Sequence, residues 1–430
     1  MKICMVGAGY VGLVSGSCFA DLGNSVWCVD KDKQKIDMLN KGQIPIFEPG
    51  LKDLINKNYS SGRLKFTTNL NNAAKDSDII FICVGTPTSN KSGSANLQYV
   101  FNVAAELRQH INKFKIIVTK STVPVTTGET IEKLISKKKN KKLFEVVSNP
   151  EFLREGEAIR DFMYPDRIVV GSNSRRANNI IKNLYGPLIK RGGKYFNTSR
   201  RAAELIKYAS NAFLATKISY INEISNLCEK VGVTVEDIAI GMGLDQRIGS
   251  RFLRAGPGYG GSCFPKDTKA LLDTAKKFKT NLSIIETTVR SNEKRHHFLL
   301  DKIKKIMKGK IFKKKITFLG VTFKANTDDM RESPSLKLIP QLHKKGAFIS
   351  YYDPSGFKND FKKFKNVNYV NKISLACKNS DLVILHTEWN EFKNLNFKKL
   401  VKKNNFSVYD MRNLYTFNKM ISKGIKYFQI

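Results

Sequence analysis

Short apolar runs in the first part of the chain alternate with amphipathic stretches, and this pattern predicts a sheet with helices wound on both faces. The runs are rich in Val and Ile, as buried strands of a parallel sheet are. The predicted strands are Lys2–Val6, Ser25–Val29, Asp78–Val84, Lys115–Lys120, Phe144–Ser148 and Arg167–Gly171. We therefore expect a doubly wound α/β domain at the N-terminus.

A different pattern follows, because residues 201–231 contain neither glycine nor proline. Apolar residues recur there at helical spacing, at Leu205, Tyr208, Ala212, Ala215, Ile218, Ile221 and Leu227. This spacing predicts one long helix, and more helical sequence continues to about residue 307. Such a region suits a domain connector or a dimer interface.

The strand pattern returns after a basic run. The predicted strands are Lys315–Leu319, Phe348–Tyr352, Leu382–His386 and Ser407–Asp410. The predicted fold is α/β, with two Rossmann-like doubly wound domains joined by a long central helix and a helical dimerisation region. The expected domains are residues 1–198, 199–307 and 308–430.

Composition excludes several classes of protein. The 430 residues are 41% hydrophobic, which argues against a disordered chain, and the seven cysteines contain no CxxC pair that would indicate a disulfide or zinc framework. We predict no metal site. No apolar run approaches the roughly 20 residues that span a bilayer, and the N-terminus lacks a secretory signal. We expect a cytoplasmic protein without membrane insertion.

The net charge of +37 raises the question of a polyanionic partner. Lysines are spread through the whole chain, so we interpret the charge as a solvated surface that requires no nucleic acid. Polyanion binding stays open as an alternative.

The N-terminal strand runs into Gly7-Ala8-Gly9-Tyr10-Val11-Gly12, which opens a predicted helix. Glycines in this pattern allow a tight turn, close approach of a pyrophosphate and close packing of helix on strand. Asp30 ends the next predicted strand, where a carboxylate accepts hydrogen bonds from the adenosine ribose. The pattern predicts a dinucleotide site that prefers NAD over NADP. The nearby Lys31, Lys33 and Lys35 leave NADP as an alternative.

Two further segments, residues 83–88 and 120–124, follow strands at the same predicted edge of the sheet. Ligands of doubly wound sheets lie beyond the carboxyl ends of the strands. The hydroxyls and prolines of these segments equally fit ordinary loops.

Residues 254–267 carry the strongest chemical signal, because four glycines within six residues precede Cys263. Pro265 suits the first turn of a helix, which would place Cys263 just before a helix N-terminus. That position favours the thiolate and marks Cys263 as a candidate nucleophile. Lys207 and Asn211 lie four residues apart and share a helix face, which is either solvated or turned into a cleft.

Several segments, in this order, resemble the UDP-glucose/GDP-mannose dehydrogenase family. They are GAGYVG (7–12), EPG (48–50), KSTVP (120–124), NPEFLREG (149–156), NAFLA (211–215), GGSCFPKD (260–267) and FKANTDDMRES (323–333). The resemblance extends from Met1 to roughly Arg412.

The resemblance implies an NAD-dependent four-electron oxidation of a nucleotide-sugar, with two NAD⁺ per sugar. A primary alcohol becomes an aldehyde, which Cys263 captures as a thiohemiacetal. A second oxidation gives a thioester, and water releases the uronate.

The resemblance also implies roles for individual residues. Cys263 is the nucleophile, Lys207 and Asn211 stabilise the oxyanion, and Asp267, Thr122 and Glu151 position water or act as acid and base. The expected cofactor contacts are Gly7, Gly9, Tyr10, Val11, Gly12, Asp30, Lys35, Gly85, Thr86, Thr122, Glu155, Lys266 and Arg331. The expected substrate contacts are Glu151, Phe152, Leu153, Arg154, Glu155, Lys207, Asn211, Arg247, Phe252, Leu253, Arg254, Gly256, Tyr259, Gly260, Lys324 and Arg412. Within the family Arg247 can reach the site across a dimer interface, so we expect a homodimer, with a higher oligomer as the alternative.

Within the family, Tyr259, Phe264-Pro265 and residues 245–249 favour UDP-glucose, and hence UDP-glucuronate as the product. GDP-mannose and UDP-N-acetylmannosamine are the alternative substrates for the same chemistry. A two-electron β-hydroxyacid dehydrogenase, which needs no cysteine, and a polyanion-binding protein that retains NAD are alternatives of other classes.

Overall fold

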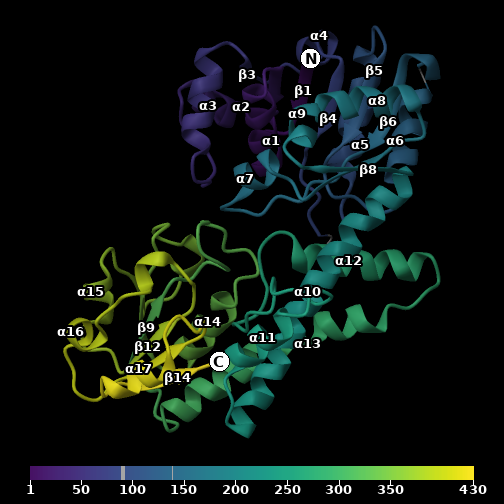
Figure 1. The fold of residues 1–430 in the computed structure, drawn as a ribbon. Coiled ribbons are helices and arrows are strands. Elements are labelled where there is room, and N and C mark those ends of the chain that lie inside the picture. Colours follow the sequence, from purple (N-terminus) through teal and green to yellow (C-terminus); the bar gives the residue numbers. More distant parts are fainter. Residues whose placement is uncertain (89–92, 138) are drawn as a thin grey trace. The chain divides into compact units, whose positions relative to one another are not determined.

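The computed structural model describes residues 1–88, 93–137 and 139–430. The described residues form two compact units, Met1–Ser210 with Lys269–Thr280 and Asn211–Thr268 with Asn281–Ile430 (Figure 1). Each unit contains one sheet of mainly parallel strands with helices around it, so the predicted α/β class is confirmed. The division into three domains stays a prediction, because the boundary between the units falls inside a helix.

The sheet of the first unit has the strand order β3-β2-β1-β4-β5-β6-β7-β8. All of its pairs are parallel except β6 with β7. Its strands are β1 (Lys2–Val6), β2 (Ser25–Val29), β3 (Leu64–Thr67), β4 (Ile79–Ile82), β5 (Lys115–Thr119), β6 (Phe144–Ser148), β7 (Arg167–Gly171) and β8 (Lys194–Thr198). Its helices are α1 (Tyr10–Asp21), α2 (Lys33–Asn40), α3 (Leu51–Ser60), α4 (Leu70–Asp76), α5 (Gln98–His110), α6 (Thr127–Ser136), α7 (Ala158–Met163), α8 (Arg175–Leu184) and α9 (Gly186–Lys190), with a short 3₁₀ turn at Lys141–Leu143.

The sheet of the second unit has the order β11-β10-β9-β12-β13-β14, and its pairs are parallel. Its strands are β9 (Lys315–Leu319), β10 (Phe348–Tyr352), β11 (Val367–Tyr369), β12 (Leu382–Leu385), β13 (Ser407–Asp410) and β14 (Lys426–Gln429). The helices around it are α14 (Ser335–Lys344), α15 (Ile373–Cys377), α16 (Phe397–Val401) and α17 (Phe417–Ser422), with 3₁₀ turns at Asn359–Phe361 and Asn390–Phe392.

The predicted long helix is confirmed as α10 (Arg200–Val231), and α11 (Val235–Gly243), α12 (Phe264–Lys277) and α13 (Ser283–Ile306) complete the helical region. Near the start of α10, Glu204 accepts hydrogen bonds from the N–H groups of Thr126 and Gly128 and from the Ser148 hydroxyl, each at 2.9 Å. Burial raises the pKa of the Glu204 carboxyl to about 7 against the effect of these donors. Glu204 thus fastens α10 to the N-terminal end of α6.

The sequence missed β3, β8, β11 and β14, which the structure adds as a correction. These strands are short and carry charged or amide side chains, and all four are edge strands. An edge strand is covered less than a central one, so it lacks the continuous apolar run by which the others were predicted. The strands predicted at Asp78–Val84, Lys115–Lys120 and Leu382–His386 are each slightly shorter than expected.

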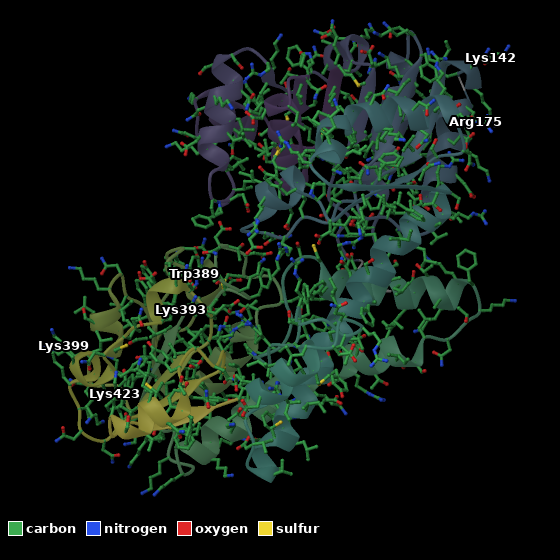
Figure 2. The ribbon with its side chains drawn as sticks, in the orientation of Figure 1. Lys142, Arg175, Trp389, Lys393, Lys399 and Lys423 are labelled. Atoms are coloured by element: carbon green, nitrogen blue, oxygen red, sulfur yellow. The ribbon has the colours of Figure 1, made fainter. Side chains whose placement is uncertain are left out.

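Many basic side chains are exposed at the surface of both units. Lys142 and Arg175 of the first unit and Lys393, Lys399 and Lys423 of the second unit are exposed and extend away from the ribbon (Figure 2). In the described part of the chain, no helix is both long and apolar enough to cross a membrane.

Candidate active site

The glycine turn between β1 and α1 has the geometry that close packing demands. Gly7 has a φ of +108°, and a Cβ on Gly12 would lie 1.8 Å from the Gly7 carbonyl oxygen. Nothing lies within 4 Å of the position that a Cβ on Gly9 would take, and no side chain caps the N-terminus of α1. The turn therefore presents open backbone and uncapped N–H groups, which fit a pyrophosphate.

Asp30, directly after β2, is tied to this turn by a hydrogen bond of 2.9 Å from the Ala8 N–H to Oδ2. Lys35 forms an ion pair with the same oxygen at 2.9 Å, and the Asp32 N–H donates to Oδ1. Burial opposes ionisation of Asp30, but these donors together hold the pKa of its carboxyl below the usual range. The side chain is an ionised acceptor beside the turn, which fits a ribose diol and repels a 2′-phosphate.

The segments after β4 and β5 lie side by side, since these strands are parallel neighbours. The Thr86 hydroxyl donates to the Thr122 carbonyl at 3.0 Å, and the Ser121 hydroxyl donates to the Val84 carbonyl at 2.7 Å. Sequence reasoning had left an ordinary loop as the alternative. The bonds show that the two loops form one connected wall at the sheet edge.

A buried ion pair lies in the first unit, between Glu151, which follows β6, and Lys207 of α10. Lys207 Nζ is 3.1 Å from Glu151 Oε1, and both side chains are almost completely buried. The ammonium also lies over the ring of Phe152, 5.2 Å from its centroid, and Arg167 stacks on that ring at 4.0 Å. The alternative that Lys207 lies on a solvated helix face is therefore wrong.

Sequence reasoning gave no role to Lys120, which lies beside this pair. Lys120 lines the same pocket as Glu151, and its ammonium donates to Asn149 Oδ1 at 3.3 Å and to the Tyr185 hydroxyl at 3.4 Å. Burial lowers the pKa of Lys120 to about 8. The sequence feature that could have indicated a buried lysine is its position at the end of an otherwise apolar strand.

In the second unit, Cys263 lies immediately before α12, as predicted. Its carbonyl accepts the first helical hydrogen bond, from the Asp267 N–H at 2.8 Å. Cys263 is partly exposed, whereas the other cysteines of the described residues are buried. Burial raises the pKa of the Cys83 and Cys377 thiols to about 12, so these are poor nucleophiles.

Asp267, one turn into α12, is held by two donors in the second unit. Asn211 Nδ2 donates to Oδ2 at 2.6 Å and Lys266 Nζ contacts Oδ1 at 2.5 Å. The Asp267 side chain is only 1% exposed. This arrangement fixes a carboxylate one helical turn from Cys263, and it confirms that Asn211 is not merely solvated.

The glycine-rich loop before Cys263 is held in place by polar residues that the sequence did not single out. Asn222 Oδ1 accepts the Gly256 N–H at 2.8 Å, and the Asn292 amide exchanges hydrogen bonds with the backbone of Tyr259. Arg295 is buried and donates to the Gly256 carbonyl at 3.2 Å. Their only signal was a polar side chain on the apolar face of a helix.

The end of this loop packs on the segment after β9. The Gly261 N–H donates to the Arg331 carbonyl at 2.8 Å, and a Cβ on Gly261 would lie 2.7 Å from the Phe323 ring. Gly261 also has a φ of +80°. Only glycine fits here, so the position of Cys263 depends on this contact.

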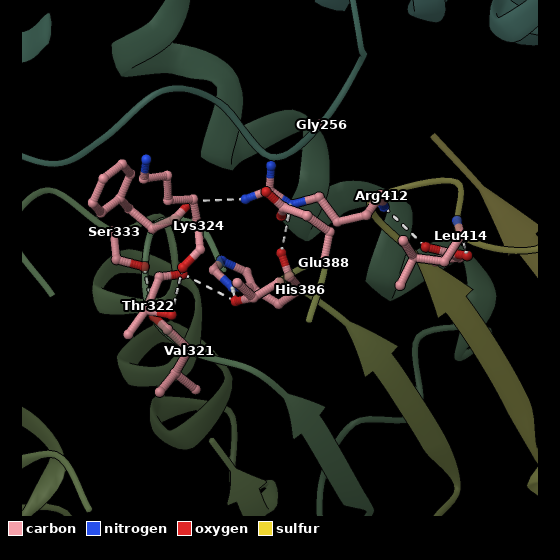
Figure 3. Close-up of polar contacts among 12 residues, drawn as sticks. Gly256, Val321, Thr322, Lys324, Ser333, His386, Glu388, Arg412 and Leu414 are labelled. Carbon is pink, nitrogen blue, oxygen red and sulfur yellow. Dashed lines mark hydrogen bonds and ion pairs between the residues drawn. The ribbon is translucent and has the colours of Figure 1, made fainter. Parts of the chain in front are cut away.

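Arg412, after β13, reaches the same loop (Figure 3). Its guanidinium donates to the carbonyls of His386 and Phe323 at 2.8 Å each and pairs with Glu388 at 3.0 Å. A Cβ on Gly256 would lie 3.4 Å from Arg412 Nη1. The guanidinium of Arg412 thus lies in a fixed position beside the backbone of the loop, an arrangement that suits an anionic ligand.

Other predicted residues point outward. Arg154 pairs with Asp161 and Glu157, and Arg247, whose side chain is 89% exposed, pairs with Asp245. Arg331 pairs with Asp329.

The predicted site residues are divided between the two units. The first unit holds Gly7, Gly9, Tyr10, Val11, Gly12, Asp30, Lys35, Gly85, Thr86, Thr122, Glu151, Phe152, Leu153, Arg154, Glu155 and Lys207. The second unit holds Asn211, Arg247, Phe252, Leu253, Arg254, Gly256, Tyr259, Gly260, Cys263, Lys266, Asp267, Lys324, Arg331 and Arg412. Lys207 and Asn211 lie one turn apart on the continuous helix α10, as the sequence predicted.

Family models match most of the chain. They are those of the UDP-glucose/GDP-mannose dehydrogenase family, with the NAD binding domain at residues 1–189, the central domain at 201–294 and the UDP binding domain at 317–417. The glycine turn and Asp30 thus lie in an NAD binding domain.

Individual proteins agree with these matches. The chain is 49% identical to UDP-glucose 6-dehydrogenase of Rhizobium meliloti (strain 1021), over all of this chain and 99% of that protein. A UDP-glucose dehydrogenase from Pyrobaculum islandicum superimposes with a TM-score of 0.91 at 33% identity, over 99% of this chain and 96% of that one. UDP-D-ManNAc dehydrogenase from Pyrococcus horikoshii has a TM-score of 0.87 at 26% identity, over 100% and 99%. The chain is an NAD-dependent oxidoreductase and belongs to the UDP-glucose/GDP-mannose dehydrogenase family.

Proposed function

We propose that the chain oxidises UDP-glucose to UDP-glucuronate, with two NAD⁺ and water consumed per sugar. The observation that carries the proposal is the placement of Cys263, a partly exposed thiol before α12 with the Asn211–Asp267–Lys266 cluster one turn away. A simple alcohol dehydrogenase needs no such thiol. In a four-electron oxidation a thiol has a clear use, because a thiohemiacetal keeps the aldehyde bound between the two steps.

The residues that would hold NAD⁺ are the glycine turn, Asp30 and the Thr86–Thr122 wall, and NAD⁺ bound there would supply the hydride acceptor for each oxidation. The Cys263 sulfur adds to the aldehyde carbon to form a thiohemiacetal, whose oxidation gives a thioester. Water then adds to the thioester carbonyl, and the thiol leaves as the uronate forms.

The remaining charged groups have roles in this sequence. Lys207 and Asn211 stabilise the oxygen anion that each addition creates, because fixed donors bind developing charge better than the neutral carbonyl. Asp267 and Glu151 orient water and take up its protons, with Thr122 as a further donor. Arg412 and Lys324 neutralise the diphosphate.

The choice of UDP-glucose over another nucleotide-sugar rests on Tyr259, on Phe264-Pro265 and on residues 245–249, together with the names of the relatives. Tyr259 and Phe252 pack edge-on against Phe264, with ring centroids 6.1 Å apart in each case. A panel of UDP-glucose, GDP-mannose and UDP-N-acetylmannosamine, each supplied with NAD⁺, tests the choice. We expect the highest kcat/KM for UDP-glucose; a higher value for either other sugar would overturn the assignment while leaving the chemistry intact.

We also propose that the chain acts as a cytoplasmic homodimer, through a face of α10. Phe213, Tyr220, Leu227 and Val231 recur on one side of the helix and are 49–65% exposed. A contiguous exposed apolar face of this kind marks an interface. The exposed Arg247 would then reach the partner's substrate.

A further inference from the structure

Glu48 belongs to the Glu-Pro-Gly motif, for which the proposed chemistry provides no role. It lies in the irregular segment between α2 and α3, yet it is only 8% exposed. A carboxylate is rarely buried without a specific set of donors.

The donors to Glu48 come from two distant parts of the chain. The Tyr10 hydroxyl donates to Glu48 Oε2 in a short hydrogen bond. The Gly156 N–H donates to the same oxygen at 2.6 Å, and the Ala158 N–H donates to Oε1 at 2.8 Å. The Gly156 N–H is also 3.0 Å from the Tyr10 hydroxyl.

Each partner belongs to a part of the site. Tyr10 is the first residue of α1, inside the glycine turn. Gly156, with a φ of +82°, directly follows residues 152–155, the proposed contact segment for sugar and cofactor, and Ala158 begins α7 two residues later. The same three helices that carry or flank these residues, α1, α3 and α7, share one apolar core.

We propose that Glu48 is a positioning residue that joins residues 152–156 to the glycine turn through Tyr10, and thereby couples cofactor binding to binding of the nucleotide-sugar. This inference rests on the proposed function, because the contact of residues 152–155 with the sugar is part of that proposal. Burial and the bond to Glu48 raise the pKa of Tyr10 well above its usual range, so its proton stays on the hydroxyl at working pH.

The anchor itself is tested without any ligand, by hydrogen–deuterium exchange of peptides that cover residues 153–163. In Glu48→Gln the amide group cannot accept from all three donors, so we expect exchange at Gly156 and Ala158 to be roughly ten-fold faster or more. Tyr10→Phe, which removes one hydroxyl and leaves the carboxylate, should give a smaller change in the same peptide. Tyr59→Phe, on an exposed tyrosine of α3, is the matched control and should leave the peptide unchanged.

The coupling is tested by fluorescence titration of NADH with and without saturating UDP-glucuronate. In the wild type each ligand should lower the dissociation constant of the other by the same factor. In Tyr10→Phe and Glu48→Gln this factor should fall toward one. Exchange in Glu48→Gln and Tyr10→Phe that matches the wild type would overturn the anchor. A factor of one in the wild type, or an unchanged factor in both variants, would overturn the coupling.

Measuring the turnover of UDP-glucose by the wild type distinguishes a failure of the inference about Glu48 from a failure of the proposed function. If no nucleotide-sugar is oxidised, the proposed function fails and the coupling to substrate fails with it, whatever the exchange shows. If the wild type oxidises UDP-glucose while the exchange and titration results are negative, the inference about Glu48 alone fails.

Discussion

At the scale of single residues, burial decides which groups are charged. Lys120 is buried beside Glu151, and its hydrogen-bond partners are neutral oxygens of Asn149 and Tyr185. Burial lowers its pKa from 10.5 to about 8. Below pH 8 the folded protein therefore keeps a buried charge that costs about 3 kcal/mol of stability.

We predict that Lys120→Met is more stable than the wild type at pH 7 by about 1–3 kcal/mol. Between pH 8 and pH 10.5 the unfolded wild type binds more protons at Lys120 than the folded one, so wild-type stability rises with pH and the difference narrows. Urea unfolding at pH 7 and pH 9.5 measures the difference in unfolding free energy between Lys120→Met and the wild type. Lys113→Met, a substitution at an exposed lysine, is the control. A difference that does not change with pH would contradict the prediction.

Single residues also show where sequence reasoning ends. The glycine turn, Asp30 and Cys263 could be found because their chemistry depends on neighbours in the chain. The function of Asn292 and Arg295 could not, because each holds a loop more than 30 residues away. A local pattern does not encode such a pair.

At the scale of elements, central strands were predictable because helices cover both of their faces. Strand β4 is Ile-Ile-Phe-Ile and completely buried, whereas β8 at the sheet edge is Lys-Tyr-Phe-Asn-Thr and mostly exposed. The loop before α12 could be recognised as glycine-rich, but the reason for Gly261 required its partner, the ring of Phe323.

We predict that Gly261→Ala lowers kcat on UDP-glucose by about 100-fold, because a Cβ would meet the Phe323 ring at 2.7 Å and displace the loop that carries Cys263. Affinity for NADH should change much less than kcat, since the glycine turn and Asp30 belong to the first unit. Steady-state kinetics and NADH titration measure both.

Gly309→Ala is the control for backbone strain alone, because Gly309 has a φ of +75° and open space around its Cβ position. Phe323→Leu in the Gly261→Ala background should restore part of the activity. Equal losses in Gly261→Ala and Gly309→Ala would contradict the steric explanation.

At the scale of the whole molecule, the apolar face of α10 formed by Phe213, Tyr220, Leu227 and Val231 stays exposed. We predict that the double variant Tyr220→Glu, Leu227→Glu is monomeric, because two carboxylates would have to enter an apolar interface. Sedimentation equilibrium should show the wild type at dimer mass and the variant at monomer mass. A monomeric wild type, or a dimeric variant, would contradict the assignment.

A dimer that shares Arg247 allows two inactive proteins to complement each other. Cys263→Ala lacks the nucleophile, and Arg247→Ala lacks the cation for its partner's site. After dissociation and reassociation of an equal mixture, we expect about a quarter of wild-type activity, because half of the dimers are mixed and each has one complete site. No recovery would show that Arg247 acts in its own subunit.

The central claim is that one thiol carries a sugar through two oxidations. The most direct measurement is the amount of NADH released per UDP-glucose, with the sugar limiting and NAD⁺ in excess, in the wild type and in Cys263→Ala. The account predicts two NADH and one uronate per sugar for the wild type, and no uronate for the variant. One NADH per sugar, or uronate formed by Cys263→Ala, would contradict it.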